Sequence, residues 1–250
     1  MTSWPFPLLI VHLGGGTLSP ENTLAALRFG AEHGFRAFEV DVKLSRDGVP
    51  FLLHDATLDR TTSESGVAGD RDWAELSRID AGSWHSRAYA GEPVPSLAAI
   101  ARYVLRNGFA LNIELKPTPG HEHATGLAVG AACARLWQGS AAPLIFSSFR
   151  PEALLGARES APDIRRALLV ETLWPDWLEM AQSLGCVAVV THQDLMNAVL
   201  LSQLHGAGLR ALCYTVNESA AARRLLALGI DGLITDAVDR FSPAADGLFD

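Results

Sequence analysis

The chain is poor in cysteine, in cationic side chains and in long apolar runs. It has three cysteines in 250 residues, an odd number that suits reduced cytosolic thiols better than a disulfide framework. Twenty Lys and Arg face 28 Asp and Glu, and the resulting formal charge of −8 argues against nucleic acid as a partner. No run approaches the roughly 18 apolar residues of a membrane span, and the N-terminus lacks the basic segment of a secretion signal. We therefore expect a cytoplasmic protein without stable membrane insertion.

Strand-like apolar segments alternate with helix-like segments along the chain. Such alternation predicts a parallel sheet. Eight strands, several of which end in Gly, Asp, His or Thr, favour a closed (β/α)₈ TIM barrel that forms one domain over residues 1–250. The predicted strands are 8–12, 36–42, 109–115, 143–148, 165–170, 187–191, 209–216 and 230–235, and the predicted helices are 21–33, 97–107, 122–137, 151–159, 176–184, 195–206 and 219–228.

The segment 49–54 breaks this alternation. It follows the second strand after the short sequence LSRDG, which cannot hold a parallel crossover of a dozen residues. Asp47-Gly48 is a turn signal, so we expect the segment to fold back as a hairpin. The Gly- and Ser-rich sequence that continues to the next helix makes an insertion after the second strand, at approximately 47–95. It falls at the end of the barrel where active sites lie.

The aromatic residues of the insertion allow two interpretations. Trp84 and Tyr89 could cover the mouth of a substrate pocket and so govern which substrate is accepted, because large loops of this kind are often functional. Alternatively, Trp73 and Trp84 could form a small core of the insertion itself.

Three carboxylates interrupt two apolar strands. Glu39 and Asp41 share one strand face, and Glu114 shares a face with Lys116 on another strand, because alternate side chains of a strand point the same way. Buried charges need partners. Oxygen ligands suit Mg²⁺, Mn²⁺ or Ca²⁺ better than they suit structural zinc. We predict that Glu39, Asp41 and Glu114 bind one divalent cation, with Mg²⁺ preferred; the alternative is that they reach solvent or an arginine.

Two histidines stand at strand ends near these carboxylates. His12 ends the first strand, and His54 ends the irregular segment. Imidazoles beside a metal site are typical general acids and bases near neutral pH, so we predict both to be catalytic, although each alone could be a packed histidine. Lys116 could offset the charge of a phosphate, or could only pair with Glu114. His192 is a further candidate neighbour of the site.

Taken in order, the sequence motifs resemble those of the glycerophosphodiester phosphodiesterases. The resemblance runs almost end to end, and the W-P-x-P before the first strand is similar to that of cytoplasmic bacterial members. It implies a (β/α)₈ barrel with an insertion after the second strand. The motifs are HxGG, PENT, ExDV, DGx₅HDx₂LxRT, DAGSW with GEP, NIExK, SSF, YTVN and DGxITD. The resemblance places metal ligands on Glu39, Asp41 and Glu114, catalytic histidines on His12 and His54, and a phosphate-contacting lysine on Lys116.

The resemblance also implies a reaction and contains one departure. It implies metal-dependent hydrolysis of small glycerophosphodiesters to sn-glycerol 3-phosphate and an alcohol, as part of glycerol and lipid metabolism. The family's first motif is normally His-Arg-Gly, and here Leu13 occupies the middle position. An arginine can form a forked contact with a phosphate, and a leucine cannot. The alternative is therefore a catalytically weakened relative that binds glycerophosphodiester or glycerol phosphate.

Overall fold

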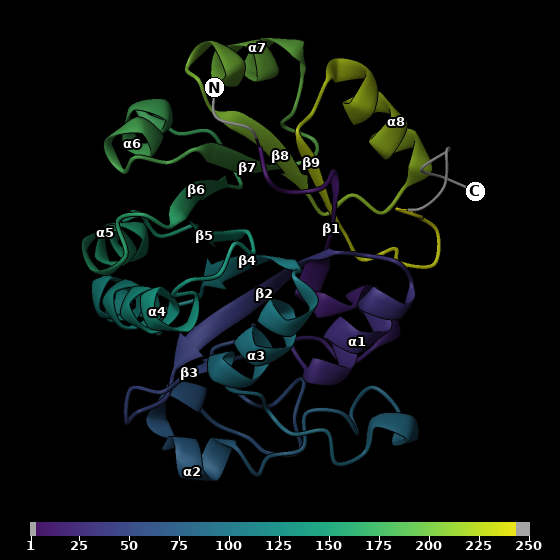
Figure 1. The fold of residues 1–250 in the computed structure, drawn as a ribbon, viewed down its shortest axis with the longest axis vertical. Helices are drawn as coiled ribbons and strands as arrows, with labels where there is room; N and C mark the ends of the chain where they lie inside the picture. Colours follow the sequence, from purple (N-terminus) through teal and green to yellow (C-terminus); the bar gives the residue numbers. More distant parts are fainter. Residues whose placement is uncertain (1–3, 244–250) are drawn as a thin grey trace.

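The computed structural model describes residues 4–243, in which parallel strands close into a barrel (Figure 1). The chain's first strand pairs with its neighbours on both sides, which closes the ring, and β3 lies outside it as an antiparallel partner of β2. This arrangement confirms the predicted (β/α)₈ barrel. The barrel strands are β1 (Leu9–Val11), β2 (Ala37–Leu44), β4 (Ala110–Leu115), β5 (Leu144–Ser148), β6 (Arg165–Val170), β7 (Ala188–His192), β8 (Arg210–Tyr214) and β9 (Gly232–Thr235).

The main helices surround the strands (Figure 1). The first one starts later than the predicted residue 21, because Thr23 caps it: its side chain accepts a hydrogen bond from the backbone of Ala26, and Asn22 before it has a left-handed φ of 56°. The other predicted helices are present within a few residues of their expected bounds. They are α1 (Leu24–Glu32), α3 (Leu97–Asn107), α4 (Glu122–Leu136), α5 (Pro151–Ser160), α6 (Trp177–Ser183), α7 (Ala198–Gly206) and α8 (Ser219–Leu228).

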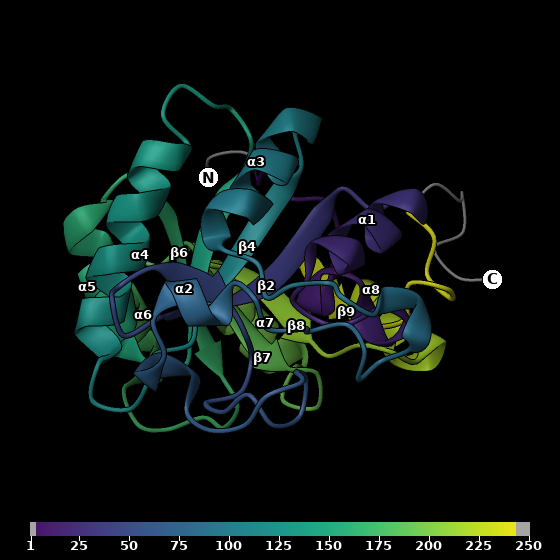
Figure 2. The same cartoon turned by 90° about the horizontal axis from the view of Figure 1, so that it is seen from below.

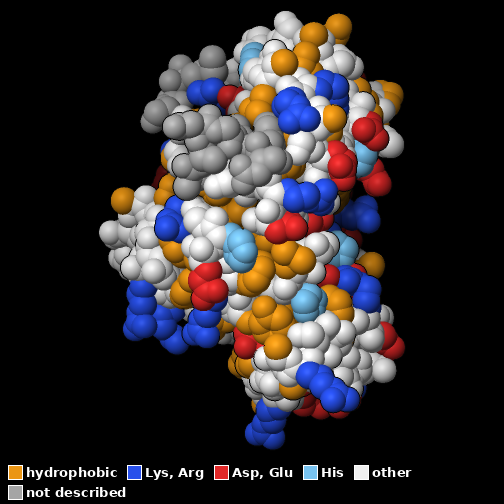
Figure 3. All heavy atoms as spheres, turned by 90° about the vertical axis from the view of Figure 1, so that its right-hand side faces the viewer, with side chains coloured by type: hydrophobic (Ala, Val, Ile, Leu, Met, Phe, Trp, Pro, Cys, Tyr) orange, Lys and Arg blue, Asp and Glu red, His pale blue; other side chains and the backbone are white. Residues whose placement is uncertain are grey.

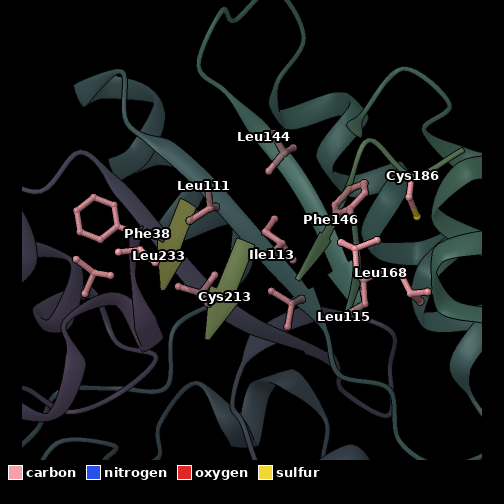
Figure 4. Close-up of a cluster of buried hydrophobic side chains, with 14 of the residues drawn as sticks. Phe38, Leu111, Ile113, Leu115, Leu144, Phe146, Leu168, Cys186, Cys213 and Leu233 are labelled. Carbon is pink, nitrogen blue, oxygen red and sulfur yellow. The ribbon is translucent and has the colours of Figure 1, made fainter. Parts of the chain in front are cut away.

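Apolar side chains fill both faces of the barrel wall. Outward-facing residues such as Phe38, Leu111 and Phe146 pack into the layer between strands and helices (Figure 4). Inward-facing residues form a smaller cluster that includes Ile10 and Ile145. Because side chains alternate along each strand, polar residues of the same strands can be held inside the barrel. The three cysteines are buried and free of disulfides, as predicted: Cys133, Cys186 and Cys213.

The insertion folds on a core of its own. β3 (Pro50–Leu52) pairs antiparallel with β2, which confirms the predicted hairpin, and a short helix, α2 (Trp73–Leu76), follows. Seen from below, α2 and its neighbouring loops lie in front of the barrel (Figure 2). Trp73 packs against the insertion's core, whereas Trp84 is 39% exposed, so only the first belongs to it. The buried core residues are Phe51, Leu53, Leu58, Ala68, Leu76, Ile79, Ala81 and Val94.

Between residues 4 and 243, no helix combines the length and the apolar character that crossing a membrane requires. On the face shown in Figure 3, basic and acidic side chains are interspersed with apolar ones.

Candidate active site

Three carboxylates from two neighbouring strands meet inside the barrel. Glu39 and Asp41 belong to β2, and Glu114 belongs to β4, where it stands opposite Asp41 in the strand register. One carboxylate oxygen of each residue lies within 4.8 Å of the others, and all three residues are buried. The structure thus brings the three predicted metal ligands together.

The environment of these carboxylates favours a bound cation. Burial, reinforced by repulsion from Asp41, raises the pKa of Glu39 to about 8 and that of Glu114 to about 7. Glu39 Oε1 is buried and has no hydrogen-bond partner among residues 4–243. Lys116 Nζ lies 2.8 Å from Glu114 Oε1 and 3.6 Å from Asp41 Oδ1. The three carboxylates form a buried, all-oxygen set of potential ligands, and such a set fits a hard divalent cation.

Asn22 holds one member of the cluster in place. Its Nδ2 donates to Asp41 Oδ2 over 2.8 Å, and its Oδ1 accepts from the Asp41 backbone over 2.9 Å. The left-handed φ of Asn22 places the amide there, and asparagine tolerates this conformation better than most residues. The segment PENT does lead into α1, and the sequence alone did not reveal this additional role of Asn22.

His12 follows β1 directly and is oriented by Asp236. Its Nδ1 lies 2.7 Å from Asp236 Oδ1, and Asn217 Nδ2 donates to the second oxygen of that carboxylate over 3.0 Å. Burial alone would lower the pKa of His12, but the hydrogen bond to Asp236 and the nearby Glu39 outweigh it and raise the pKa to about 9. Its Nε2 is 3.9 Å from Glu39 Oε2. The imidazolium form of His12 therefore persists at neutral pH.

His54 is oriented by its chain neighbour. Its Nδ1 lies 2.7 Å from Asp55 Oδ1, and Asp55 in turn pairs with Arg60 over 2.7 Å. The same arginine forms two hydrogen bonds with Glu21, so the insertion is tied to the segment before α1. His54 Nε2 lies 3.1 Å from Lys116 Nζ.

The charge of Lys116 fixes the tautomer of His54. Burial alone would lower the pKa of Lys116, but Asp41 and Glu114 outweigh it and raise that pKa, so the side chain remains an ammonium. Because the ammonium donates to Nε2, the proton of a neutral His54 sits on Nδ1, facing Asp55.

A pocket of about 430 Å³ joins these groups. Its wall includes both catalytic candidates, His12 and His54, together with Glu39, Glu114 and Lys116. Three residues that the sequence suggested as pocket residues or site neighbours do not line the pocket. Trp84 and Tyr89 of the insertion are two of them, and His192 is the third, its ring packing edge-on against Tyr214 with centroids 5.8 Å apart.

A pocket with acid–base groups at the carboxyl ends of barrel strands defines a TIM-barrel enzyme. Residues 12–240 match the model of the Glycerophosphoryl diester phosphodiesterase family. The chain belongs to that family, which confirms the predicted family and enzyme class.

Proteins and solved structures similar to this chain match it over nearly its whole length. A glycerophosphodiester phosphodiesterase of Caldanaerobacter subterraneus is 30% identical over 235 residues, which cover 92% of this chain and 93% of that protein. The structure of an Oleispira antarctica phosphodiesterase in complex with the product sn-glycerol-3-phosphate matches with a TM-score of 0.86 and 34% identity, over 93% of this chain and 94% of that one. A glycerophosphodiester phosphodiesterase structure from Agrobacterium tumefaciens matches with a TM-score of 0.77 and 25% identity, over 94% and 98% of the two chains.

Proposed function

We propose that this barrel hydrolyses glycerophosphodiesters to sn-glycerol 3-phosphate and an alcohol with the help of one divalent cation. The observation that carries the proposal is the group of three buried carboxylates within 4.8 Å of one another, beside two carboxylate-oriented histidines. Family membership supports the substrate class, and the Oleispira antarctica structure contains the corresponding product. We also propose that residues 1–250 act as one unit in the cytoplasm.

Glu39, Asp41 and Glu114 would hold the cation, with Mg²⁺ preferred and Mn²⁺ or Ca²⁺ as alternatives. When bound, such an ion polarises a phosphoryl oxygen as a Lewis acid. Lys116 lines the pocket beside these carboxylates, where its ammonium stabilises the negative charge of the phosphate.

His54 acts as the general base in this proposal. Its Nδ1 proton is held by Asp55, and its Nε2 carries the lone pair that faces the pocket lysine. This nitrogen removes the proton of the attacking hydroxyl while the new P–O bond forms. The attacking hydroxyl is either water, which gives glycerol 3-phosphate directly, or the neighbouring hydroxyl of the substrate, which gives a cyclic phosphate that water must then open. His54 removes the proton of the first attacking hydroxyl on both routes.

His12 acts as the general acid. The hydrogen bond to Asp236 holds it as an imidazolium near neutral pH, with a pKa of about 9. As the P–O bond to the alcohol breaks, the Nε2 proton moves to the departing oxygen, and His12 becomes neutral. The proposal thus assigns proton donation to His12 and proton acceptance to Nε2 of His54.

Leu13 supports the second candidate function, a weakened relative that binds the diester or glycerol phosphate. Its backbone N–H donates to Glu39 Oε2 over 3.1 Å with a left-handed φ of 54°, and its side chain offers no charge to a phosphate. Product analysis separates the two functions. With glycerophosphocholine and Mg²⁺, phosphorus NMR should show glycerol 3-phosphate as the product. Saturable binding without any new phosphorus signal would support the binding protein.

A further inference from the structure

The segment 13–22, between β1 and α1, holds two of the three carboxylates of the candidate cation site. The backbone N–H of Leu13 donates to Glu39 Oε2 over 3.1 Å, and the Asn22 side chain forms two hydrogen bonds with Asp41. Leu13 and Asn22 both have a left-handed backbone, with φ of 54° and 56°. This conformation is unfavourable outside glycine and persists only where surrounding contacts hold it. The cation site therefore depends on whatever fixes this segment.

The insertion supplies contacts that fix the segment from outside the barrel. Arg60 donates from Nη1 and Nη2 to the two carboxylate oxygens of Glu21 over 2.7 and 2.8 Å, and Glu21 directly precedes Asn22. Glu92, also in the insertion, accepts a hydrogen bond from the Ala25 backbone over 3.0 Å. Ala25 lies in the first turn of α1, where a carboxylate is favourable. The insertion thus clamps the chain on both sides of Asn22.

The guanidinium of Arg60 also holds the aspartate that orients His54. Its Nε donates to Asp55 Oδ2 over 2.7 Å, and its Nη2 donates to Asp55 Oδ1 over 3.0 Å. The same Oδ1 lies 2.7 Å from His54 Nδ1. The hydrogen bonds from Arg60 hold the pKa of Asp55 well below its usual range, so Asp55 stays a carboxylate. One planar guanidinium therefore makes forked contacts with two carboxylates, a geometry that a lysine ammonium cannot form.

We propose that Arg60 is a positioning residue that couples the general base to the cation site. Through Asp55 it orients the imidazole of His54, and through Glu21 it holds the segment that supports the metal-binding carboxylates. Arg60 is outside the wall of the pocket, so it acts through these partners rather than on the substrate. The insertion then serves to join the two halves of the catalytic machinery. The inference rests on the proposed diesterase function and adds a residue to it.

Arg60→Ala tests both contacts of the guanidinium. Calorimetric titration should show Mg²⁺ affinity about tenfold weaker than in wild type, and kcat on glycerophosphocholine at saturating Mg²⁺ should fall about 10–100-fold, with a much smaller change in KM. The Tm should fall by about 4 °C or less, because the Arg60 side chain is 47% exposed and exposed ion pairs contribute little. Arg60→Lys should recover only part of each loss, since it keeps the charge without the fork.

Arg46→Ala is the matched control. Arg46 forms a forked contact with Asp72 over 2.9 and 2.6 Å at the base of the insertion, and it is connected neither to His54 nor to the segment 13–22 by a hydrogen bond or ion pair within residues 4–243. Its loss should leave both Mg²⁺ affinity and kcat at the wild-type values.

Two further variants separate the contacts. Glu21→Gln should weaken Mg²⁺ binding, with kcat near the wild-type value once Mg²⁺ saturates, whereas Asp55→Asn should lower kcat and leave Mg²⁺ affinity near that of wild type. Adding Glu21→Gln to Arg60→Ala should weaken Mg²⁺ binding no further, because both changes break the same contact.

Wild-type Mg²⁺ affinity or wild-type kcat in Arg60→Ala would overturn the coupling, and so would equal losses in Arg46→Ala. Fully additive effects of Glu21→Gln and Arg60→Ala on Mg²⁺ binding would overturn the contact through Glu21. If wild type binds Mg²⁺ but releases no glycerol 3-phosphate from glycerophosphocholine, the proposed function itself fails. That outcome is distinct, because the Mg²⁺ titrations of the Arg60 variants still decide whether Arg60 supports the cation site.

Discussion

Asn22 and Asp41 are joined by two hydrogen bonds, one to the carboxylate and one from the backbone of the same aspartate. The distances are 2.8 and 2.9 Å, and both residues are buried. The amide thereby fixes the orientation of Asp41 within the carboxylate cluster before any cation arrives. Such outer contacts commonly control the affinity of a metal site.

Replacing Asn22 by alanine should weaken both the fold and the cation site. The loss of hydrogen bonds to a buried charged group should lower the free energy of unfolding by about 1.5–3 kcal/mol, and cation affinity should fall by about 10–100-fold. Urea unfolding and calorimetric Mg²⁺ titration measure these changes. Asn107→Ala, at an exposed position on α3, is the control and should change neither. Unaltered Mg²⁺ affinity in Asn22→Ala would show that Asn22 does not support the site.

The stabilising effect of Mg²⁺ should grow with pH. The pKa values of Glu39 and Glu114 are raised from 4.5 to about 8 and about 7 without a cation. Because the folded state binds these two protons more tightly than the unfolded state, they contribute to the free energy of unfolding. This contribution is fully present below pH 4.5 and is lost as the pH rises through 7 and 8. Mg²⁺ replaces the lost protons, so the Tm difference between Mg²⁺ and chelator should widen across this range. A Tm difference that does not change with pH would contradict this assignment.

Asp236→Asn should lower the pKa of His12 from about 9 toward the ordinary 6.5, because the charge that stabilises the imidazolium is removed. Nuclear magnetic resonance titration of the His12 ring protons measures this directly. In wild type, the stability due to the raised pKa is fully present below pH 6.5 and is lost as the pH rises through 9. The variant should lose most of this contribution, and its activity should decline at a lower pH than that of wild type. An unshifted titration would remove Asp236 from the mechanism.

Leu13→Arg should raise kcat/KM on glycerophosphodiesters. A charge-assisted contact contributes about 1.5–3 kcal/mol, which corresponds to roughly a 10–100-fold gain in rate. The gain requires that residue 13 faces the substrate. Leu13→Lys at matched Mg²⁺ and pH serves as the control, because it adds charge without the fork and should gain less. An equal or lower kcat/KM in a folded Leu13→Arg protein would show that another group fills the arginine's role.

Alternation of apolar segments was enough to predict the barrel, the hairpin of 49–54 and the position of the insertion. It also indicated residues of the candidate site, because charged side chains in apolar strands are visible in the sequence. Glu39, Asp41 and Glu114 are examples, and the register of β2 and β4 brings them together.

The supporting residues could not be predicted in the same way. Asp236 reaches His12 only because β9 closes the barrel against β1, and the two residues are 224 positions apart. The contact of Asn22 with Asp41 depends on a left-handed backbone conformation at Asn22. The sequence around it predicts only the start of a helix. Each role arises from tertiary contacts rather than from local pattern.

The central claim is that the three carboxylates hold a cation that the diesterase reaction requires. The direct measurement is glycerol 3-phosphate release from glycerophosphocholine, with Mg²⁺ and with excess chelator, in wild type and Glu39→Gln. Wild type should release product with Mg²⁺, lose that activity with chelator and regain it when Mg²⁺ is restored. Glu39→Gln should need a higher Mg²⁺ concentration for half-maximal rate. Product release that persists in chelator, or a Glu39→Gln variant with the wild-type Mg²⁺ dependence, would contradict the account.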